Sequence, residues 1–397
     1  MAETINKSFH QWIEARKQND FSIFLPLLSE LVVLKREEAH ILGFDDHPYN
    51  ALLNEHDKGS TVKLIDQVFN SIRTPLKNLL DQIQNQPQVE DKFLFSYYPK
   101  DKQWQFGLEM LRRLGYDFNA GRQDISEHPF SVSFNSNDVR ITTRINENDL
   151  GSMTWSCIHE LGHAFYEQGL PDIHYGLPLG EAISYTIHES QSRLWENHVG
   201  RSGVFCETWL PLFISYFPGQ LKDVSPLDFF AAINKVNPSL IRTEADELTY
   251  HFHVMIRYEL EKKLVEKSLE VADIPAYWNE NYRQLLNVAV PDDLKGCLQD
   301  VHWSHGSFGY FPTYSLGSFY ASQFYATATR EIPLLEESLR KSDTRPLLHW
   351  LRNQIHRFGR MYTSEEMSVH ITGEGLNVSH FIKYLTDKYR LIYKLPV

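Results

Sequence analysis

The segment His159-Glu160-Leu161-Gly162-His163 carries the residue types of a metal-dependent hydrolase. Residues four apart lie on one face of an α-helix, so both imidazoles can reach the same cation. Glu160 lies one step round the helix, where it can accept a proton from a water molecule on the metal. The pentapeptide also occurs by chance in histidine-rich chains, so on its own it leaves open that both histidines are ordinary helix residues.

A third ligand is expected because a catalytic zinc ion usually binds three protein side chains and one water molecule. A loop rich in Gly and Pro at 169–180 separates the histidines from a second helical segment at 181–199. Glu189 lies in that segment, 26 positions after His163, and a returning antiparallel helix can place its carboxylate opposite the imidazoles. We therefore favour His159, His163 and Glu189 as metal ligands. The alternative, a solvated Glu189, stays open at this point.

The elements that must position these residues are mostly helices. Apolar residues recur at helical spacing, and capping residues and glycines mark several helix ends. We expect helices within residues 5–42, 61–83, 101–114, 149–168, 181–199 and 244–267. On the helix at 181–199, spacings of about one and two turns place Glu181, Tyr185, Glu189 and Glu196 on one face.

The segment 130–145 has a different pattern. Two runs rich in β-branched and aromatic residues flank the turn-forming residues 135–138, which predicts an antiparallel hairpin near 130–146. The fold class is therefore mainly α with one small antiparallel sheet. Because no linker or repeat interrupts the chain, we expect a single domain over residues 1–397.

The composition excludes several functions. The 397 residues carry a formal net charge of −12, so nucleic acid is not an expected partner. No apolar run reaches the length of about 18 residues that a membrane span needs. The polar N-terminus shows no signal peptide, and three cysteines argue for a reducing compartment, so we expect a cytoplasmic protein. Cys157 lies off the predicted metal face, and we interpret it as a packing residue.

Short motifs along the chain then resemble a known family, the M32 metallocarboxypeptidases of the carboxypeptidase Taq type. The resemblance runs from about residue 8 to the C-terminus and is specific because the motifs occur in the family's order. They are HPF (128–130), DVRIT (138–142), HELGH (159–163), HESQSRLWEN (188–197), IRTEAD (241–246), GCLQDVHW (296–303) and GYFPTY (309–314).

The resemblance implies a large helical metallopeptidase fold with a long deep groove and zinc, or cobalt, at its base. It implies that C-terminal residues are removed one at a time from peptides with a free C-terminus, commonly by a homodimer. Residues 1–90 would form a helical wall of the groove and residues 128–320 the catalytic core. Family members usually carry on the order of a hundred further residues before the segment QWIEARKQNDFSIFLPLL, which help to cover the groove.

A carboxypeptidase must bind a free α-carboxylate, which the planar guanidinium of arginine matches with two hydrogen bonds. By resemblance Arg242, in IRTEAD, is this group, and Arg257 is a second candidate further along the chain. The residues alone leave open that Arg242 forms an ordinary ion pair with Asp246.

Attack on a peptide carbonyl builds negative charge on its oxygen, and a preorganised donor stabilises that charge. The family motifs suggest His302 and Tyr310 as catalytic donors and Tyr314 as a substrate-binding residue, although Tyr and His are also frequent core residues. A metal-bound histidine normally donates its second ring nitrogen to a carboxylate, and we expect Asp300 or an acidic residue of the helix at 181–197, such as Glu181, in this role.

Three further motif residues have structural interpretations. His128 either hydrogen-bonds near the pocket or fixes the turn before the hairpin, and Asp138 and Arg140 lock the hairpin.

Two other functions remain open for the chain. One is a zinc endopeptidase or aminopeptidase with the same ligands, and the other is a shortened, non-catalytic relative that binds peptides.

Overall fold

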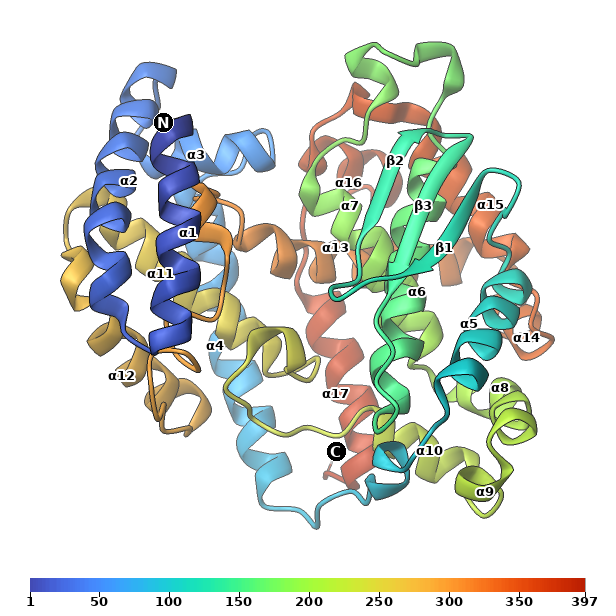
Figure 1. The fold of residues 1–397 in the computed structure, drawn as a ribbon. Coiled ribbons are helices and arrows are strands. Elements are labelled where there is room, and N and C mark those ends of the chain that lie inside the picture. The colour runs from blue at the N-terminus through green and yellow to red at the C-terminus, as the bar shows by residue number, and fades with distance from the viewer. Residues whose placement is uncertain (397) are drawn as a thin grey trace. The chain divides into compact units, whose positions relative to one another are not determined.

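The computed structural model describes residues 1–396 and is mainly helical, with one small sheet (Figure 1). This confirms the predicted fold class. The chain divides into two compact units, each built from two stretches. The first unit comprises residues 1–83 and 236–315, and the second comprises residues 84–235 and the chain from residue 316 on. The single domain and the groove stay predictions. No helix among residues 1–396 is both long and apolar enough to cross a membrane.

The first unit is built from helices. They are α1 (Ala2–Gln18), α2 (Phe21–Leu42), α3 (Tyr49–His56), α4 (Val62–Gln84), α11 (Tyr250–Glu266) and α12 (Ile274–Leu286), with short 3₁₀ turns at Arg242–Glu244, Val271–Asp273 and His302–His305. The predicted helical stretch 5–42 is two helices, because Asn19 takes the left-handed conformation that ends α1. The Asp20 side chain then accepts a hydrogen bond from the Ser22 N–H and caps α2.

The second unit contains the other helices. They are α5 (Lys100–Leu114), α6 (Leu150–Glu167), α7 (Tyr185–Arg193), α8 (Gly203–Tyr216), α9 (Pro218–Leu221), α10 (Pro226–Ile233), α13 (Pro312–Glu331, whose first residues belong to the first unit), α14 (Leu335–Arg340), α15 (Arg345–Gln354), α16 (Ser364–Thr372) and α17 (Ser379–Tyr393). A π-helical segment, Leu194–Gly200, continues α7. Short 3₁₀ turns lie at Lys92–Phe95, Asp172–His174, Pro178–Gly180 and His356–Met361.

The sheet of the second unit has three strands in the order β1-β3-β2. β2 (Ser131–Asn135) and β3 (Asp138–Thr143) are antiparallel, which confirms the predicted hairpin. β1 (Gly121–Ile125) pairs in parallel with β3 and was not predicted. Its sequence, GRQDI, has no run of apolar or β-branched residues, so a periodicity argument finds no strand there. A side chain at Gly121 would collide with the Val139 carbonyl, and only glycine allows this pairing.

α6 is central to the second unit and lies against the sheet (Figure 1). The Asp149 side chain caps it by accepting hydrogen bonds from the N–H groups of Gly151 and Ser152. Trp155, Phe165 and the other apolar residues of α6 are buried in the core of this unit. A helix held by its cap and packed on several sides provides a rigid support for the histidines.

Gly162, inside the HELGH motif, allows α7 to lie directly against α6. A Cβ atom at this position would lie 2.6 Å from the Gln191 carbonyl oxygen and 2.5 Å from the Ser192 Cα. Both are main-chain atoms, which cannot rotate away. The glycine therefore sets the distance between the helix with the two histidines and the helix with Glu189.

Two predicted helix starts are displaced. The segment predicted at 181–199 begins its helix at Tyr185, where the Ser184 hydroxyl accepts from the Ile187 N–H as an N-cap. The helix predicted from residue 244 begins at Tyr250. Before it, the Asp246 carboxylate accepts hydrogen bonds from the main-chain N–H groups of Leu248 and Thr249, which hold a turn instead of a helix.

Candidate active site

His159 and His163 lie on one face of α6, and Glu189 of α7 faces both. Nε2 of His159 lies 3.8 Å from Oε2 of Glu189, and Nε2 of His163 lies 3.7 Å from the same oxygen. The three candidate ligand atoms are all within 4.8 Å of one another. Among the described residues this is the one group of three or more His, Cys, Asp or Glu side chains close enough to share a metal ion.

The donor set fits a zinc ion. Zinc bonds to imidazole nitrogen and carboxylate oxygen of about 2.0–2.2 Å, arranged tetrahedrally, place ligand atoms about 3.4 Å apart. The two distances to Glu189 exceed this value by only a few tenths of an ångström, which small side-chain rotations can supply. Two histidines and one glutamate are also a ligand set of catalytic zinc sites, which keep the fourth position for water.

The two oxygens of the Glu189 carboxylate have different partners. Oε1 accepts a 2.7 Å hydrogen bond from Nε of Arg193, one turn further along the helix. Oε2 accepts from the Ser192 hydroxyl at 3.2 Å and faces the two imidazoles. Because Arg193 holds Oε1, one oxygen is presented to a metal. Glu189 is buried, so it is not the solvated helix residue considered as the alternative.

Glu196, in the π-helical segment, accepts from the second ring nitrogen of His159. Nδ1 of His159 lies 2.9 Å from Oε2 of Glu196. Burial acts to raise the pKa of Glu196, but Arg193, His159 and Arg201 outweigh it and hold the pKa well below its usual value. Glu196 therefore stays ionised, and the hydrogen bond leaves the lone pair of His159 on Nε2, which faces Glu189.

The expectation that Asp300 supports a ligand histidine is wrong, whereas the expectation of an acidic residue from the segment 181–197 is confirmed by Glu196 and not by the suggested Glu181. Asp300 pairs with Arg242 and Arg257, and Glu181 pairs with Arg360. Glu181 also lies before the first residue of α7, so it does not share the helix face on which it was placed. Glu196 was on that face, but its spacing alone did not distinguish a hydrogen-bonding role from a solvated one.

Glu160 is 6% exposed and accepts a 2.5 Å hydrogen bond from the hydroxyl of Ser131, the first residue of β2. Burial raises the pKa of Glu160, and the charge of His159 and the Ser131 hydroxyl offset this in part. A carboxylate with a raised pKa is a stronger proton acceptor than an exposed one. Sequence reasoning missed Ser131, although it directly follows the HPF motif.

The other proposed site residues lie in the first unit, where two arginines share one aspartate. Arg242 donates from Nε to Oδ1 of Asp300 at 2.9 Å, and Arg257 donates from Nε to Oδ2 at 2.6 Å. Both guanidinium groups are almost fully buried. The three groups together carry one net positive charge, which suits an anionic partner. The suggested ion pair with Asp246 is wrong, because Asp246 accepts from main-chain N–H groups instead.

Three aromatic side chains lie next to one another, and one of them, Tyr314, contacts Arg242. Nε2 of His302 lies 3.0 Å from the Tyr314 hydroxyl, and the Tyr314 ring lies 4.8 Å from Cζ of Arg242. The Tyr310 ring is 5.2 Å from that of Tyr314 and 5.5 Å from that of His302. Burial, followed by the charge of Arg242, lowers the pKa of His302 to about 3, so its imidazole is neutral at pH 7. The structure therefore brings these candidates together with the arginine.

The remaining motif residues have structural contacts. Cys157 is buried and accepts a 2.9 Å hydrogen bond from the Gln123 side chain, which confirms its packing role. Asp138 and Arg140 pair through two 2.8 Å hydrogen bonds in the hairpin, as expected. The carbonyl of His128 accepts from the Ser126 hydroxyl at 2.6 Å, which agrees with a role in the turn.

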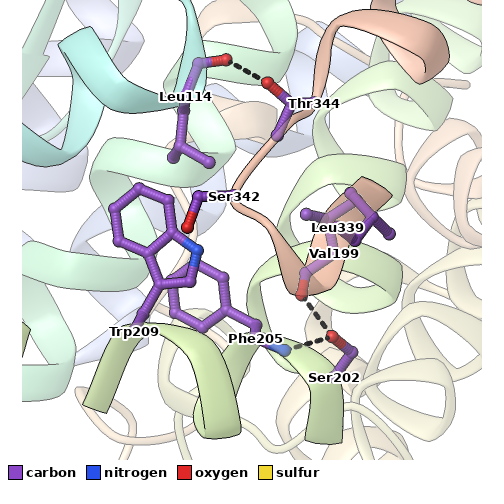
Figure 2. A pocket seen from close by; sticks show the side chains of 8 residues that line it. All are labelled: Leu114, Val199, Ser202, Phe205, Trp209, Leu339, Ser342 and Thr344. Atoms are coloured by element: carbon purple, nitrogen blue, oxygen red, sulfur yellow. Dashed lines mark hydrogen bonds between the residues drawn. The ribbon is translucent and has the colours of Figure 1, made fainter. Parts of the chain in front are cut away.

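Figure 2 shows a small pocket of the second unit that is lined by none of these groups. None of the metal-cluster residues contributes to it. It is lined by Leu114, Val199, Ser202, Phe205, Trp209, Leu339, Ser342 and Thr344.

Comparison with known proteins decides which family has this arrangement. The family model described as Carboxypeptidase Taq (M32) metallopeptidase matches residues 1–389. The chain belongs to this family. The resemblance read from the sequence motifs is thereby confirmed, and so is the identification of the chain as a peptide hydrolase that needs a divalent metal.

Individual M32 relatives are similar over nearly the whole chain. Thermostable carboxypeptidase 1 of Thermus thermophilus is 42% identical over 402 aligned positions, which cover 99% of this chain and 78% of that protein. Carboxypeptidase 1 of Bacillus subtilis is 39% identical, and the alignment covers 98% of this chain and 78% of that protein. The crystal structure of the M32 carboxypeptidase from Deinococcus radiodurans R1 superimposes with a TM-score of 0.97 at 39% identity, covering 99% of this chain and 79% of that one.

Proposed function

We propose that this M32 metallocarboxypeptidase removes C-terminal residues from peptides with a zinc ion held by His159, His163 and Glu189. The observation that carries the proposal is the approach of these three ligands beside the buried carboxylate of Glu160. Cobalt has a similar preference for nitrogen and oxygen donors and is the alternative metal.

A divalent cation bound here acts as a Lewis acid, which polarises the peptide carbonyl and acidifies a water molecule. The residues of the chain do the remaining work. Glu160 accepts the proton from the attacking water, and Ser131 holds the Glu160 carboxylate in place by its hydrogen bond. The protonated Glu160 then donates to the leaving amine, so the same side chain is base and acid in turn.

We assign substrate binding to the arginine pair and its aromatic neighbours. Arg242 binds the terminal carboxylate, and Arg257 with Asp300 holds the Arg242 guanidinium in position. Charge supports this role, because two arginines and one aspartate leave a positive charge for a carboxylate to neutralise. The neutral imidazole of His302 and the hydroxyl groups of Tyr310 and Tyr314 are donors for the developing charge on the carbonyl oxygen.

Hydrolysis of one peptide in two forms tests this function. With zinc supplied, the wild-type protein should shorten the peptide that has a free C-terminus and leave the amidated form intact, since the amide lacks the carboxylate. Glu160→Gln should cleave neither form at a measurable rate while still binding zinc, because glutamine cannot accept the proton. Equal cleavage of both forms would instead indicate an endopeptidase or aminopeptidase. Zinc binding without any cleavage by the wild type would indicate a non-catalytic relative.

The expected homodimer and the cytoplasmic location stay predictions. Light scattering of the purified protein at several concentrations would test the dimer, with a mass twice the 46.4 kDa of the chain expected.

A further inference from the structure

His188 contacts one of the proposed ligands although it is not a ligand itself. It directly precedes Glu189 on α7, and its Nδ1 lies 2.6 Å from Nδ1 of His163. Its other ring nitrogen, Nε2, lies 2.8 Å from Oε1 of Glu167, in the last turn of α6. The three side chains form a continuous series of hydrogen bonds, which we term the His163–His188–Glu167 chain.

The position of the ligand atom fixes the direction of both hydrogen bonds. Nε2 of His163 faces Oε2 of Glu189, so a metal there needs the lone pair on Nε2 and leaves the hydrogen on Nδ1. That hydrogen is donated to His188, which must accept at Nδ1 and therefore carries its own hydrogen on Nε2. The Glu167 carboxylate accepts this second hydrogen.

We propose that His188 is a positioning residue for the metal site, which with Glu167 holds the His163 ring in the tautomer and orientation that bind the metal. This inference rests on the metal ligands proposed above. Hydrogen bonds to ligand histidines typically contribute 10- to 100-fold to metal affinity, because they fix the ring and increase its basicity. His159 has such a bond directly to Glu196, whereas His163 reaches its carboxylate through a second imidazole.

Because His188 directly precedes Glu189 in the sequence, its position links two of the three proposed ligands. One turn of α7 supplies the ligand Glu189 and, through the preceding residue, orients the ligand His163 on α6. A displacement of this turn would therefore disturb two of the three ligands together. A purely structural role is the alternative for His188, since its ring also packs 5.2 Å from that of Tyr166.

Zinc affinity, measured by competition with a chromogenic chelator, tests the role of the His163–His188–Glu167 chain. His188→Phe keeps a ring but cannot accept a hydrogen bond, and it should weaken zinc binding 10- to 100-fold. His188→Asn places an amide oxygen near the position of Nδ1 but does not reach Glu167, and it should lose clearly less affinity than His188→Phe. Glu167→Leu should weaken binding, and adding His188→Phe to it should cost little more, because Glu167 acts through His188.

His380→Phe is the matched control, because His380 contacts the carboxylate of Glu374 as another His–Glu pair of the second unit. It should bind zinc as the wild type does, and thermal unfolding of the metal-free variants should show all of them folded. Wild-type affinity in His188→Phe would overturn the inference. An equal loss in His188→Asn and His188→Phe would also overturn it, because it would assign the effect to packing. A wild-type protein that binds no zinc would refute the metal ligands themselves.

Discussion

At the scale of single residues, the site depends on carboxylates with unequal surroundings. Both carboxylates are buried, but Glu189 has one oxygen held by Arg193 and one facing the histidines, whereas Glu160 accepts from a single side-chain hydroxyl and has its pKa raised by burial. The first arrangement suits a metal ligand, since it presents one oxygen in a fixed direction. The second suits a proton acceptor, since burial disfavours the charged form and so strengthens the base.

Ser131 offers a test at this scale. Ser131→Ala removes the hydroxyl that holds Glu160, and hydrogen bonds to a charged group contribute about 1.5 kcal/mol or more. We expect kcat to fall about 10-fold, with KM little changed. Without the Ser131 hydroxyl, the Glu160 carboxylate is oriented toward the attacking water for a smaller share of the time. Steady-state kinetics on a short peptide would measure this. Ser131→Thr, which keeps the hydroxyl, should restore most of the rate, and an unchanged kcat in Ser131→Ala would contradict the role.

Glu261 gives a prediction about pH and stability in the first unit. Its fully buried carboxylate accepts from the Tyr49 hydroxyl, the Trp303 indole and the Gly309 N–H, yet burial raises its pKa from 4.5 to about 7. Between these two values the folded protein binds more protons than the unfolded one. The free energy of unfolding should therefore fall as pH rises from 4.5 to 7, by up to about 3 kcal/mol.

Glu261→Gln removes this titration. The free energy of unfolding of this variant should therefore not show the fall between pH 4.5 and 7 that the wild type shows. Urea unfolding at a series of pH values would measure both, with the exposed Glu337→Gln as a control that keeps the wild-type slope. Parallel curves for wild type and Glu261→Gln would show that the carboxylate is not titrating in this range.

Which residues could be predicted from the sequence depends on how local their partners are. The proposed ligands His159 and His163 follow from spacing on one helix, and Glu189 follows from the loop and returning helix after them. The residues around Arg242 came from the family motifs. Ser131 and His188 were missed as contacts of the site. Their roles depend on how β2 and α7 pack on α6, which no spacing along the chain encodes.

At the scale of elements, the α6–α7 pair determines whether the three ligands meet. The start of α7 at Tyr185 was missed although the neighbouring N-cap Ser184 marks it. The strand β1 was missed because its short segment has weak periodicity and pairs with β3, which is more distant in sequence. The long helices α4, α5 and α6 were predicted to within about two residues at each end, since apolar spacing and caps mark them.

Gly162→Ala tests the close approach of these two helices. The added methyl group would meet the main chain of Gln191 and Ser192, so the helices must separate. We expect a loss of about 2 kcal/mol in the free energy of unfolding and weaker zinc binding, because Glu189 moves with α7. Gly203→Ala is the control, since no atom lies within 4 Å of a Cβ there. A Gly162→Ala variant with wild-type stability and zinc affinity would refute the account of the helix contact.

At the scale of the whole molecule, the residues that we propose for the chemistry come from both units. The proposed metal ligands and Glu160 belong to the second unit, and the arginines, His302 and the tyrosines belong to the first. The M32 family relationship extends over both, since its model matches residues 1–389. The sequence predicted the helical class and the hairpin correctly but showed no boundary between the units, because the chain leaves the first unit and returns to it without a distinct linker.

The zinc content of the purified protein tests the central claim most directly. After dialysis against zinc and removal of loosely bound metal, elemental analysis of the wild type should find one zinc ion per chain. Glu189→Leu, which keeps the side-chain volume but offers no ligand oxygen, should retain far less than one. Equal zinc content in the two proteins, or none in the wild type, would contradict the assignment of His159, His163 and Glu189 as the metal site.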